Sequence, residues 1–118
     1  MTQPAGNLTI SDEMKGPVCI MRVQGKITFG PNVEQLRKRF EALLDAGNNQ
    51  FVIDLTQVPW MDSAGLGELV ACHKKMLTTS GTFKLVLTGK LREWITQLRL
   101  PIEVYAGEDE ALAATQES

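Results

Sequence analysis

The chain has 118 residues, 43% of them hydrophobic and 22% charged, which is the size and composition of one globular domain over residues 1–118. Its formal net charge of −2 excludes the basic field that drives nonspecific binding to nucleic acid, so no direct nucleic-acid partner is expected. No apolar run is long enough to span a membrane, and residues 1–8 lack the apolar segment of a signal peptide, so we expect a cytoplasmic protein.

The N-terminal part predicts two strands joined by a tight turn. Leu8–Met14 is a weak strand, and Val18–Val23 is a stronger one because it is rich in apolar and β-branched residues. Gly16-Pro17 between them is a turn signal. The two strands are close enough in sequence to form a hairpin.

A helix and a buried strand follow. Asn32 is expected to cap a helix that continues to about Ala46, and residues 47–49 (Gly-Asn-Asn) end it. Phe51–Leu55 is a continuous apolar strand interrupted only by Asp54, which indicates a place in the centre of a sheet.

The helix after Ser63 is predicted from one apolar stripe, and Ser80-Gly81 ends it. The residues of this stripe are Leu66, Leu69, Val70, His73, Met76 and Leu77.

The last third predicts two further strands and two short helices. Phe83–Leu87 is a strand of the buried type, and residues 89–98 form a short helix with Leu91, Ile95 and Leu98 turned inward. Ile102–Tyr105 is the last strand, and Glu108–Thr115 is a helix whose first turn is acidic, as the helix dipole favours. The order β-β-α-β-α-β-α-β-α predicts an α/β fold with a mixed sheet of about five strands and helices packed on it.

The strand-to-helix turn at residues 58–67 is the most informative segment. Asp-Ser-Ala-Gly-Leu-Gly at positions 62–67 places Ser63 at the start of a helix, where unpaired N–H groups and the helix dipole favour negative charge. A serine in this place can carry a phosphate, and the small residues around it let another protein approach closely.

Enzymatic and nucleotide-binding interpretations find little support. His73, the only histidine, lies roughly 15 Å from Ser63 along the same predicted helix and cannot serve it as a general base. Met61 occupies the position where a nucleophile elbow needs glycine. Gly65-Leu66-Gly67 lacks the third glycine of a dinucleotide fingerprint, because position 70 is valine. We therefore expect no enzyme and no catalytic residue.

No metal or other cofactor is expected. Cys19 and Cys72 have no companion at metal-ligand spacing and are interpreted as reduced core thiols. Asp54 and Asp62 flank the turn and could hold Mg²⁺, but backbone bonding by Asp54 and helix capping by Asp62 are favoured.

Trp60 and the two glycines leave alternatives open. Met61 is expected in the core, whereas Trp60 could equally pack under the helix or contact a partner. Gly65 and Gly67 in the first helical turns each cost about 1 kcal/mol of stability relative to alanine. Close packing on the sheet, close approach of a partner, or both would offset this cost.

Residues 52–67 resemble the central signature of STAS-domain proteins, in particular the bacterial anti-sigma factor antagonists. In that family a strand ending in Val/Ile-Asp-Leu-Ser/Thr-x-Val precedes an apolar pair and then Asp-Ser-Ser/Thr/Ala-Gly-Leu-Gly. The likeness extends to Gly25-Lys26-Ile27-Thr28, to the strand at 84–87 and to the closing strand and helix at 104–112, so it covers nearly the whole chain.

The resemblance implies a regulatory binding protein. Ser63 matches the serine that a cognate serine-kinase anti-sigma factor phosphorylates; the unphosphorylated antagonist binds that factor, the phosphorylated one is released, and a serine/threonine phosphatase resets it. The expected partner-binding residues are Thr28, Trp60, Asp62, Ser63, Ala64, Gly65, Leu66 and Gly67. Many members carry an acidic residue where Lys26 or Thr28 stands, and we expect this loop to affect which kinase is accepted.

Two other hypotheses remain. The chain could be a STAS interaction module of another signalling or lipid-transport complex, in which Ser63 is structural. An enzyme or nucleotide-binding protein is the third hypothesis, and the missing catalytic partners make it the weakest.

Overall fold

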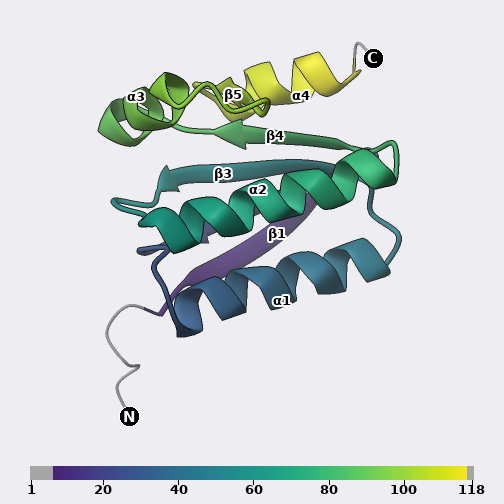
Figure 1. Cartoon of the computed structure of the whole chain (residues 1–118). Coiled ribbons are helices and arrows are strands. Elements are labelled where there is room, and N and C mark those ends of the chain that lie inside the picture. The colour runs from purple at the N-terminus through teal and green to yellow at the C-terminus, as the bar shows by residue number, and fades with distance from the viewer. Residues whose placement is uncertain (1–6, 117–118) are drawn as a thin grey trace.

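The computed structural model describes residues 7–116, in which strands and helices follow the predicted β-β-α-β-α-β-α-β-α order (Figure 1). The strands are β1 (Thr9–Lys15), β2 (Val18–Gln24), β3 (Gln50–Gln57), β4 (Thr82–Val86) and β5 (Glu103–Tyr105). The helices are α1 (Pro31–Asp45), α2 (Ser63–Thr78), α3 (Gly89–Gln97) and α4 (Glu108–Gln116).

The five strands form one mixed sheet in the order β1-β2-β3-β4-β5. β1 and β2 are the expected antiparallel hairpin, and the other neighbouring strands pair in parallel. β3 is the central strand, as its apolar sequence predicted. Since parallel strands end at the same edge of a sheet, the loops that follow β2, β3 and β4 meet at one end of the molecule.

The two faces of the sheet pack against different helices. Cys19, Met21 and Val23 of β2 belong to the larger core, which also contains buried side chains of α1, α2 and α3. Val18 and Ile20 alternate with them and face a smaller core that includes Ala111 of α4. Figure 1 shows α1 and α2 side by side in front of the sheet, and these two helices contact one another.

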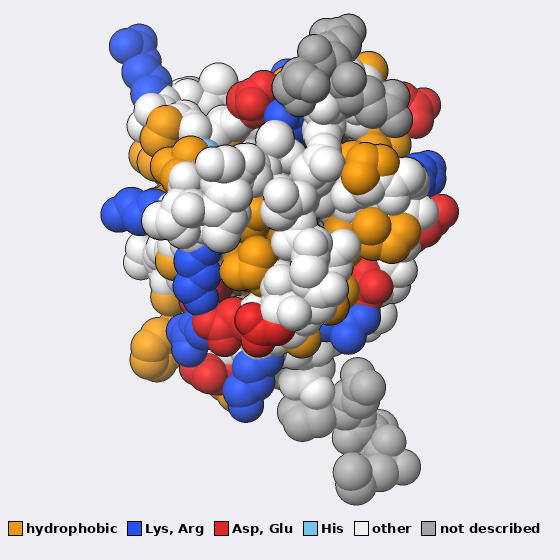
Figure 2. All heavy atoms as spheres, turned by 90° about the vertical axis from the view of Figure 1, so that its right-hand side faces the viewer, with side chains coloured by type: hydrophobic (Ala, Val, Ile, Leu, Met, Phe, Trp, Pro, Cys, Tyr) orange, Lys and Arg blue, Asp and Glu red, His pale blue; other side chains and the backbone are white. Residues whose placement is uncertain are grey.

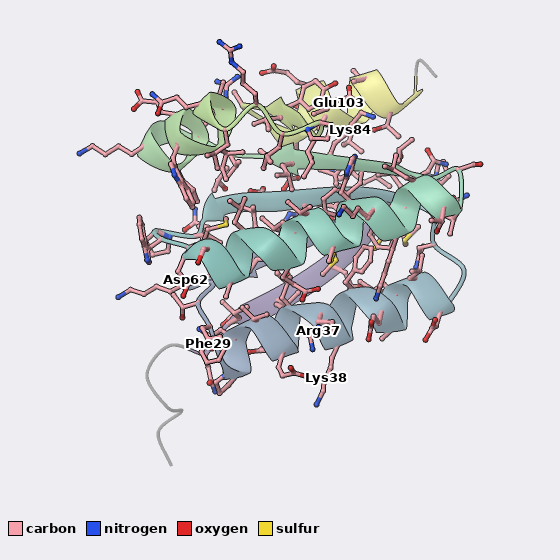
Figure 3. All side chains as sticks on the ribbon, in the orientation of Figure 1. Phe29, Arg37, Lys38, Asp62, Lys84 and Glu103 are labelled. Carbon is pink, nitrogen blue, oxygen red and sulfur yellow. The ribbon has the colours of Figure 1, made fainter. Side chains whose placement is uncertain are left out.

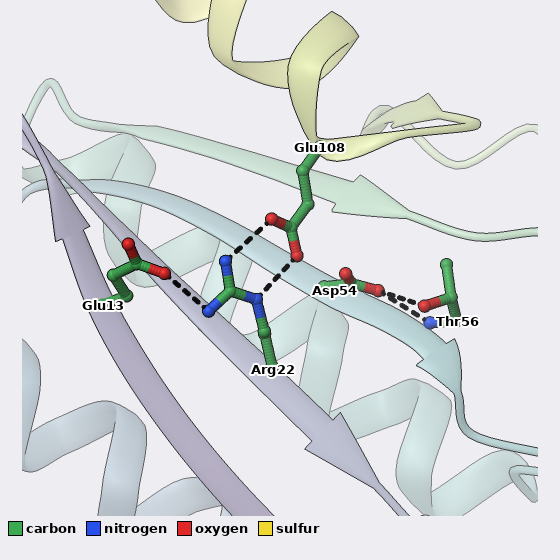
Figure 4. A network of polar contacts seen from close by, with 5 residues as sticks. All are labelled: Glu13, Arg22, Asp54, Thr56 and Glu108. Carbon is green, nitrogen blue, oxygen red and sulfur yellow. Dashed lines mark hydrogen bonds and ion pairs between the residues drawn. The ribbon is translucent and has the colours of Figure 1, made fainter.

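Ion pairs hold α4 to the second face of the sheet (Figure 4). Arg22 Nε and Nη2 donate to the two carboxylate oxygens of Glu108, both at 2.9 Å, and Nη1 donates to Glu13 at 2.7 Å. Asp54 lies beside Glu108, and its Oδ1 accepts hydrogen bonds from the backbone N–H and the hydroxyl of Thr56. Asp54 therefore bonds the neighbouring backbone, which is the role that the sequence interpretation favoured over binding of Mg²⁺.

Three details of the sequence interpretation are wrong. Asn32 does not cap α1: the helix begins at Pro31 after Gly30, and the Asn32 side chain instead donates to the Lys26 carbonyl at 2.7 Å. Proline at the first position has no N–H that needs a cap, so the helix can begin two residues earlier than a cap at Asn32 would allow.

Leu77 and Leu98 were expected to face inward, but 63% and 42% of their surfaces are exposed. Met76 is the buried residue of the last turn of α2, and one step along a helix turns Leu77 away by about 100°. Leu98 lies just beyond α3, and Leu100 packs against the core instead.

Neither a helix able to span a membrane nor a metal-binding cluster is found in the part of the chain that the structure describes. No helix within residues 7–116 is long and apolar enough to cross a bilayer. The same residues contain no group of three or more His, Cys, Asp or Glu side chains placed to hold a metal ion. Figure 2 shows the end opposite the Asp62 turn, where apolar side chains form small groups among charged and polar ones.

Candidate partner-binding site at the start of helix α2

Two loops from different parts of the chain are joined beside the start of α2. Ile27, in the loop after β2, forms an isolated parallel bridge with Met61, in the turn after β3. The Ile27 N–H donates to the Trp60 carbonyl at 3.1 Å, and the Asp62 N–H donates to the Ile27 carbonyl at 3.3 Å. Ile27 and Met61 are fully buried, which confirms the core position expected for Met61.

Asp62 fixes both the helix and the loop. Its Oδ1 accepts from the Gly65 N–H and its Oδ2 from the Phe29 N–H, each at 3.0 Å. The predicted capping role is confirmed, and the second bond adds a link to the β2–α1 loop that the sequence did not reveal. These backbone hydrogen bonds lower the pKa of the Asp62 carboxyl, and the bond from Phe29 has the largest effect. Asp62 is therefore ionised at neutral pH.

Ser63 is the first residue of α2 and is exposed. Within residues 7–116, no hydrogen-bond partner is found for its hydroxyl. The hydroxyl is therefore open to a phosphoryl donor, and the start of a helix tolerates the added negative charge.

The two glycines of α2 have different surroundings. A Cβ on Gly65 would lie 2.2 Å from the Ile27 carbonyl oxygen, so the helix can lie against the loop only because this residue is glycine. A Cβ on Gly67 would meet nothing within 4 Å. Packing on the fold therefore accounts for Gly65, whereas nothing in the fold requires Gly67 to lack a side chain.

Gly67 opens onto a groove between α1 and α2, next to Ser63. The groove has a volume of about 450 Å³, and its apolar wall is formed by Phe29, Val33 and Ala64. Phe29 is 83% exposed and stands at the same end of the molecule as Asp62 (Figure 3).

Charged side chains close the far end of this groove. Arg37 of α1 binds Glu68 through Nε at 3.0 Å and Glu34 through Nη1 at 2.8 Å. The Glu68 carboxylate is buried and also accepts from the Cys72 thiol, whose pKa is raised mainly by burial. Since Glu68 is directed at Arg37, Asp62 is the carboxylate that stands next to Ser63 without a cationic partner in the described residues.

Trp60 lies on the other side of the turn. The residue is 53% exposed, and its ring stacks on Trp94 of α3, with the ring centroids 6.0 Å apart and the planes 16° apart. Trp60 therefore packs against α3 and not under the start of α2, and contact of its exposed surface with a partner stays a prediction.

The sequence profile of the STAS domain matches residues 9–111. The chain belongs to the STAS domain family. No curated protein matches the sequence.

Solved structures share this STAS fold over almost the full chain. An anti-sigma factor antagonist from Mycobacterium paratuberculosis is 26% identical, with 93% of this chain and 95% of that chain covered and a TM-score of 0.78. The Bacillus cell fate determinant SpoIIAA in its phosphorylated form is 20% identical, with 90% and 98% covered and a TM-score of 0.71. The murine anion transporter Slc26a9 is 15% identical, with 96% of this chain but 22% of that chain covered and a TM-score of 0.77.

The STAS fold brings the predicted site residues together at one end of the molecule. Ser63, Gly67 and Trp60 are exposed, Thr28, Asp62, Ala64 and Leu66 are half-buried, and Gly65 is buried. His73 is buried and packs its ring against Phe83, with centroids 5.9 Å apart, in agreement with its place in the apolar stripe of α2.

Phe29 and Trp94 were not predicted to belong to this region. Each is an aromatic residue in a segment remote from Ser63 in sequence, and only the pairing of the strands brings it close. The one available signal was Phe29 itself, a large apolar side chain directly before the turn residues Gly30-Pro31.

Proposed function

We propose that this STAS domain is an anti-sigma factor antagonist. It binds a serine-kinase anti-sigma factor when Ser63 is unphosphorylated and is released when that kinase phosphorylates Ser63, which regulates sigma-factor-dependent transcription. The observation that carries the proposal is the exposed Ser63 hydroxyl, held at the start of α2 by the Asp62 cap. The 26% identity to a known antagonist, over nearly all of both chains, supports it.

The partner surface is proposed to include the exposed residues around Ser63. Phe29, Ala64 and the open position at Gly67 offer an apolar groove on one side, and Trp60 offers an aromatic face on the other. Large apolar side chains that become fully desolvated supply much of the binding energy in protein interfaces. Thr28 and Leu66, both half-buried, contribute the edges of this surface.

Release is proposed to follow from the charge of the phosphate. A phosphoserine adds about −1.5 to −2 charges at pH 7. It would stand beside the ionised Asp62, within an interface whose other nearby surface is apolar. Both the repulsion between like charges and the desolvation of the phosphate oppose binding, while the N-terminus of α2 keeps the folded state tolerant of the charge.

The exposure of Ser63 also suits removal of the phosphate. A phosphatase needs the phosphoserine in its own active site, and the first residue of a helix at the end of the molecule can be presented without unfolding. We therefore include a serine/threonine phosphatase as the second partner.

The alternative is a STAS module in which Ser63 is structural. It predicts that the Ser63 hydroxyl forms a hydrogen bond to another group of the fold. No such hydrogen bond is found within residues 7–116. The likeness to the murine transporter, at 15% identity, reflects the shared fold and does not favour this alternative.

The decisive experiment is phosphoryl transfer to this protein from a serine-kinase anti-sigma factor of the same organism. With labelled ATP we expect one phosphate on Ser63, no transfer to Ser63→Ala, and undiminished transfer to Ser11→Ala, which removes an exposed hydroxyl from β1. The unphosphorylated protein should co-elute with the kinase. Binding without any transfer would reject the switch and leave the interaction-module alternative.

A further inference from the structure

A second groove lies between α3 and β5, away from Ser63. Its volume is about 270 Å³. It is lined by Arg92, Ile95, Thr96, Arg99, Leu100, Ile102 and Val104, and none of these residues lines the groove beside Ser63.

The floor of the second groove is apolar. Ile95 and Ile102 are buried in the larger core, and Leu100 and Val104 pack against it. Alternation along β5 places Glu103 on the opposite face of the sheet, where it pairs with Lys84 at 3.3 Å (Figure 3). Among residues 7–116, no carboxylate lines this groove.

Two arginines provide the positive charge of the groove. In the described part of the chain, neither Arg92 nor Arg99 has a carboxylate within ion-pair distance. The other arginines there, at positions 22, 37 and 39, are all paired with acidic side chains. The groove is thus locally cationic on a chain of net charge −2.

The backbone at Arg99 is unusual. Its φ of 53° lies in the left-handed region, and its N–H donates to the Thr96 carbonyl at 3.2 Å at the end of α3. Glycine is the usual residue at such a position, since it adopts this conformation without strain. Arginine at position 99 therefore costs conformational free energy relative to glycine. A contact between its side chain and a ligand would explain why the position is arginine and not glycine.

We propose that this groove binds an acidic peptide segment of a partner protein. An apolar side chain of the segment lies on the floor formed by Ile95 and Ile102, and flanking carboxylates pair with Arg92 and Arg99. Carboxylates are chosen over other occupants because the groove joins an apolar floor to two forked guanidinium donors, which suit bidentate pairing with carboxylates. The site is independent of the switch at Ser63.

The test is an NMR titration of the full chain, labelled with ¹⁵N, against the peptide acetyl-Asp-Glu-Leu-Asp-Leu-amide. We expect amide shifts within residues 92–104 and binding at millimolar or lower concentration. An Asn-Gln-Leu-Asn-Leu peptide, without the charges, should bind at least about fivefold more weakly.

The variants separate binding from stability. Arg92→Gln and Arg99→Gly should each weaken binding about fivefold, whereas Lys74→Gln, which removes an exposed charge from α2, should not change it. Arg99→Gly should also keep or raise the melting temperature, because it relieves the left-handed backbone. If Arg99→Gly failed to fold, Arg92→Gln would carry the test.

Three results would overturn the proposal. These are the absence of shifts at millimolar peptide, equal binding of the charged and uncharged peptides, and shifts outside residues 92–104. Inorganic phosphate that reproduces the same shifts with equal affinity would also overturn it, because the groove would then be a site for simple anions.

Discussion

Gly65 and Gly67 stand two positions apart in one helix, yet they serve different purposes. The carbonyl of Ile27 occupies the space where a Cβ on Gly65 would stand, so the contact between loop and helix excludes any side chain. Gly67 faces the groove and touches nothing there. The first glycine belongs to the fold, and the second leaves room for the proposed partner.

Gly65→Ala should therefore destabilise the protein. Since the added methyl group collides with backbone, either the loop or the helix must shift, and overpacking of this kind costs about 1–3 kcal/mol. Urea denaturation followed by circular dichroism measures the free energy of unfolding. An unchanged midpoint would show that the loop yields without cost.

Gly67→Ala is the matched control, and it should change the free energy of unfolding in the opposite direction. The position is helical and open, so alanine should raise the free energy of unfolding by up to about 1 kcal/mol. The same substitution should weaken binding of the anti-sigma factor, because it fills part of the groove. A variant that is more stable and binds equally well would remove Gly67 from the proposed interface.

At the level of elements, two carboxyl groups beside the start of α4, Glu108 and Asp54, have pKa values shifted in opposite directions. Arg22 lowers the pKa of Glu108 to about 2, whereas burial, together with the neighbouring Glu108 carboxylate, raises the pKa of Asp54 above its ordinary value. Glu108 therefore adds stability that is complete above its unfolded pKa and is lost as the pH falls toward 2. Asp54 behaves in the opposite way, and its charge lowers stability as the pH rises through its raised pKa.

Asp54→Asn should stabilise the protein at pH 7. Asparagine keeps the oxygen that accepts from Thr56 and can donate to Glu108, while it removes the repulsion between the two carboxylates. Denaturation at several pH values should show that the gain shrinks below the ordinary pKa of aspartate. A gain that does not depend on pH would contradict the assignment.

Glu108→Gln is the comparison within the same network. It should lower stability at pH 7, where the pair with Arg22 is lost, and have a much smaller effect near pH 2, where about half of Glu108 is protonated in wild type. The two variants thus test the two carboxylates separately.

Across the whole molecule, the sequence predicts the elements better than their ends. Apolar strands and amphipathic helices depend on repeated local patterns, so the order of elements and the central position of β3 could be predicted. The start of α1 depends on how the chain enters the helix through Gly30 and Pro31, and the exposure of Leu77 depends on where the packing on the sheet stops. Neither is contained in a local pattern.

The same reasoning applies to the candidate site. Asp62, Ser63 and Met61 are contiguous, so one motif predicts the cap, the exposed hydroxyl and the buried residue before them. Phe29 and Trp94 join this region only because β2, β3 and β4 end at the same edge of the sheet. A single sequence does not specify such contacts between loops, although it predicts the strands that create them.

The whole molecule also determines whether the proposed switch acts on the fold or on the interface. Ser63→Asp places a negative charge at the start of α2, next to Asp62 but without contact to the core. The melting temperature and the pattern of amide resonances should stay close to wild type, because the helix dipole favours a negative charge there.

Binding should respond quite differently. We expect Ser63→Asp to weaken the affinity for the anti-sigma factor at least about tenfold, equivalent to about 1.4 kcal/mol, measured by isothermal titration calorimetry. Ser11→Asp adds the same charge to β1 and should leave the affinity unchanged. Equal affinity of Ser63→Asp and wild type would reject repulsion as the cause of release. Loss of the folded state in Ser63→Asp would instead show that the charge acts through unfolding, since the interface would then be lost together with the helix that carries it.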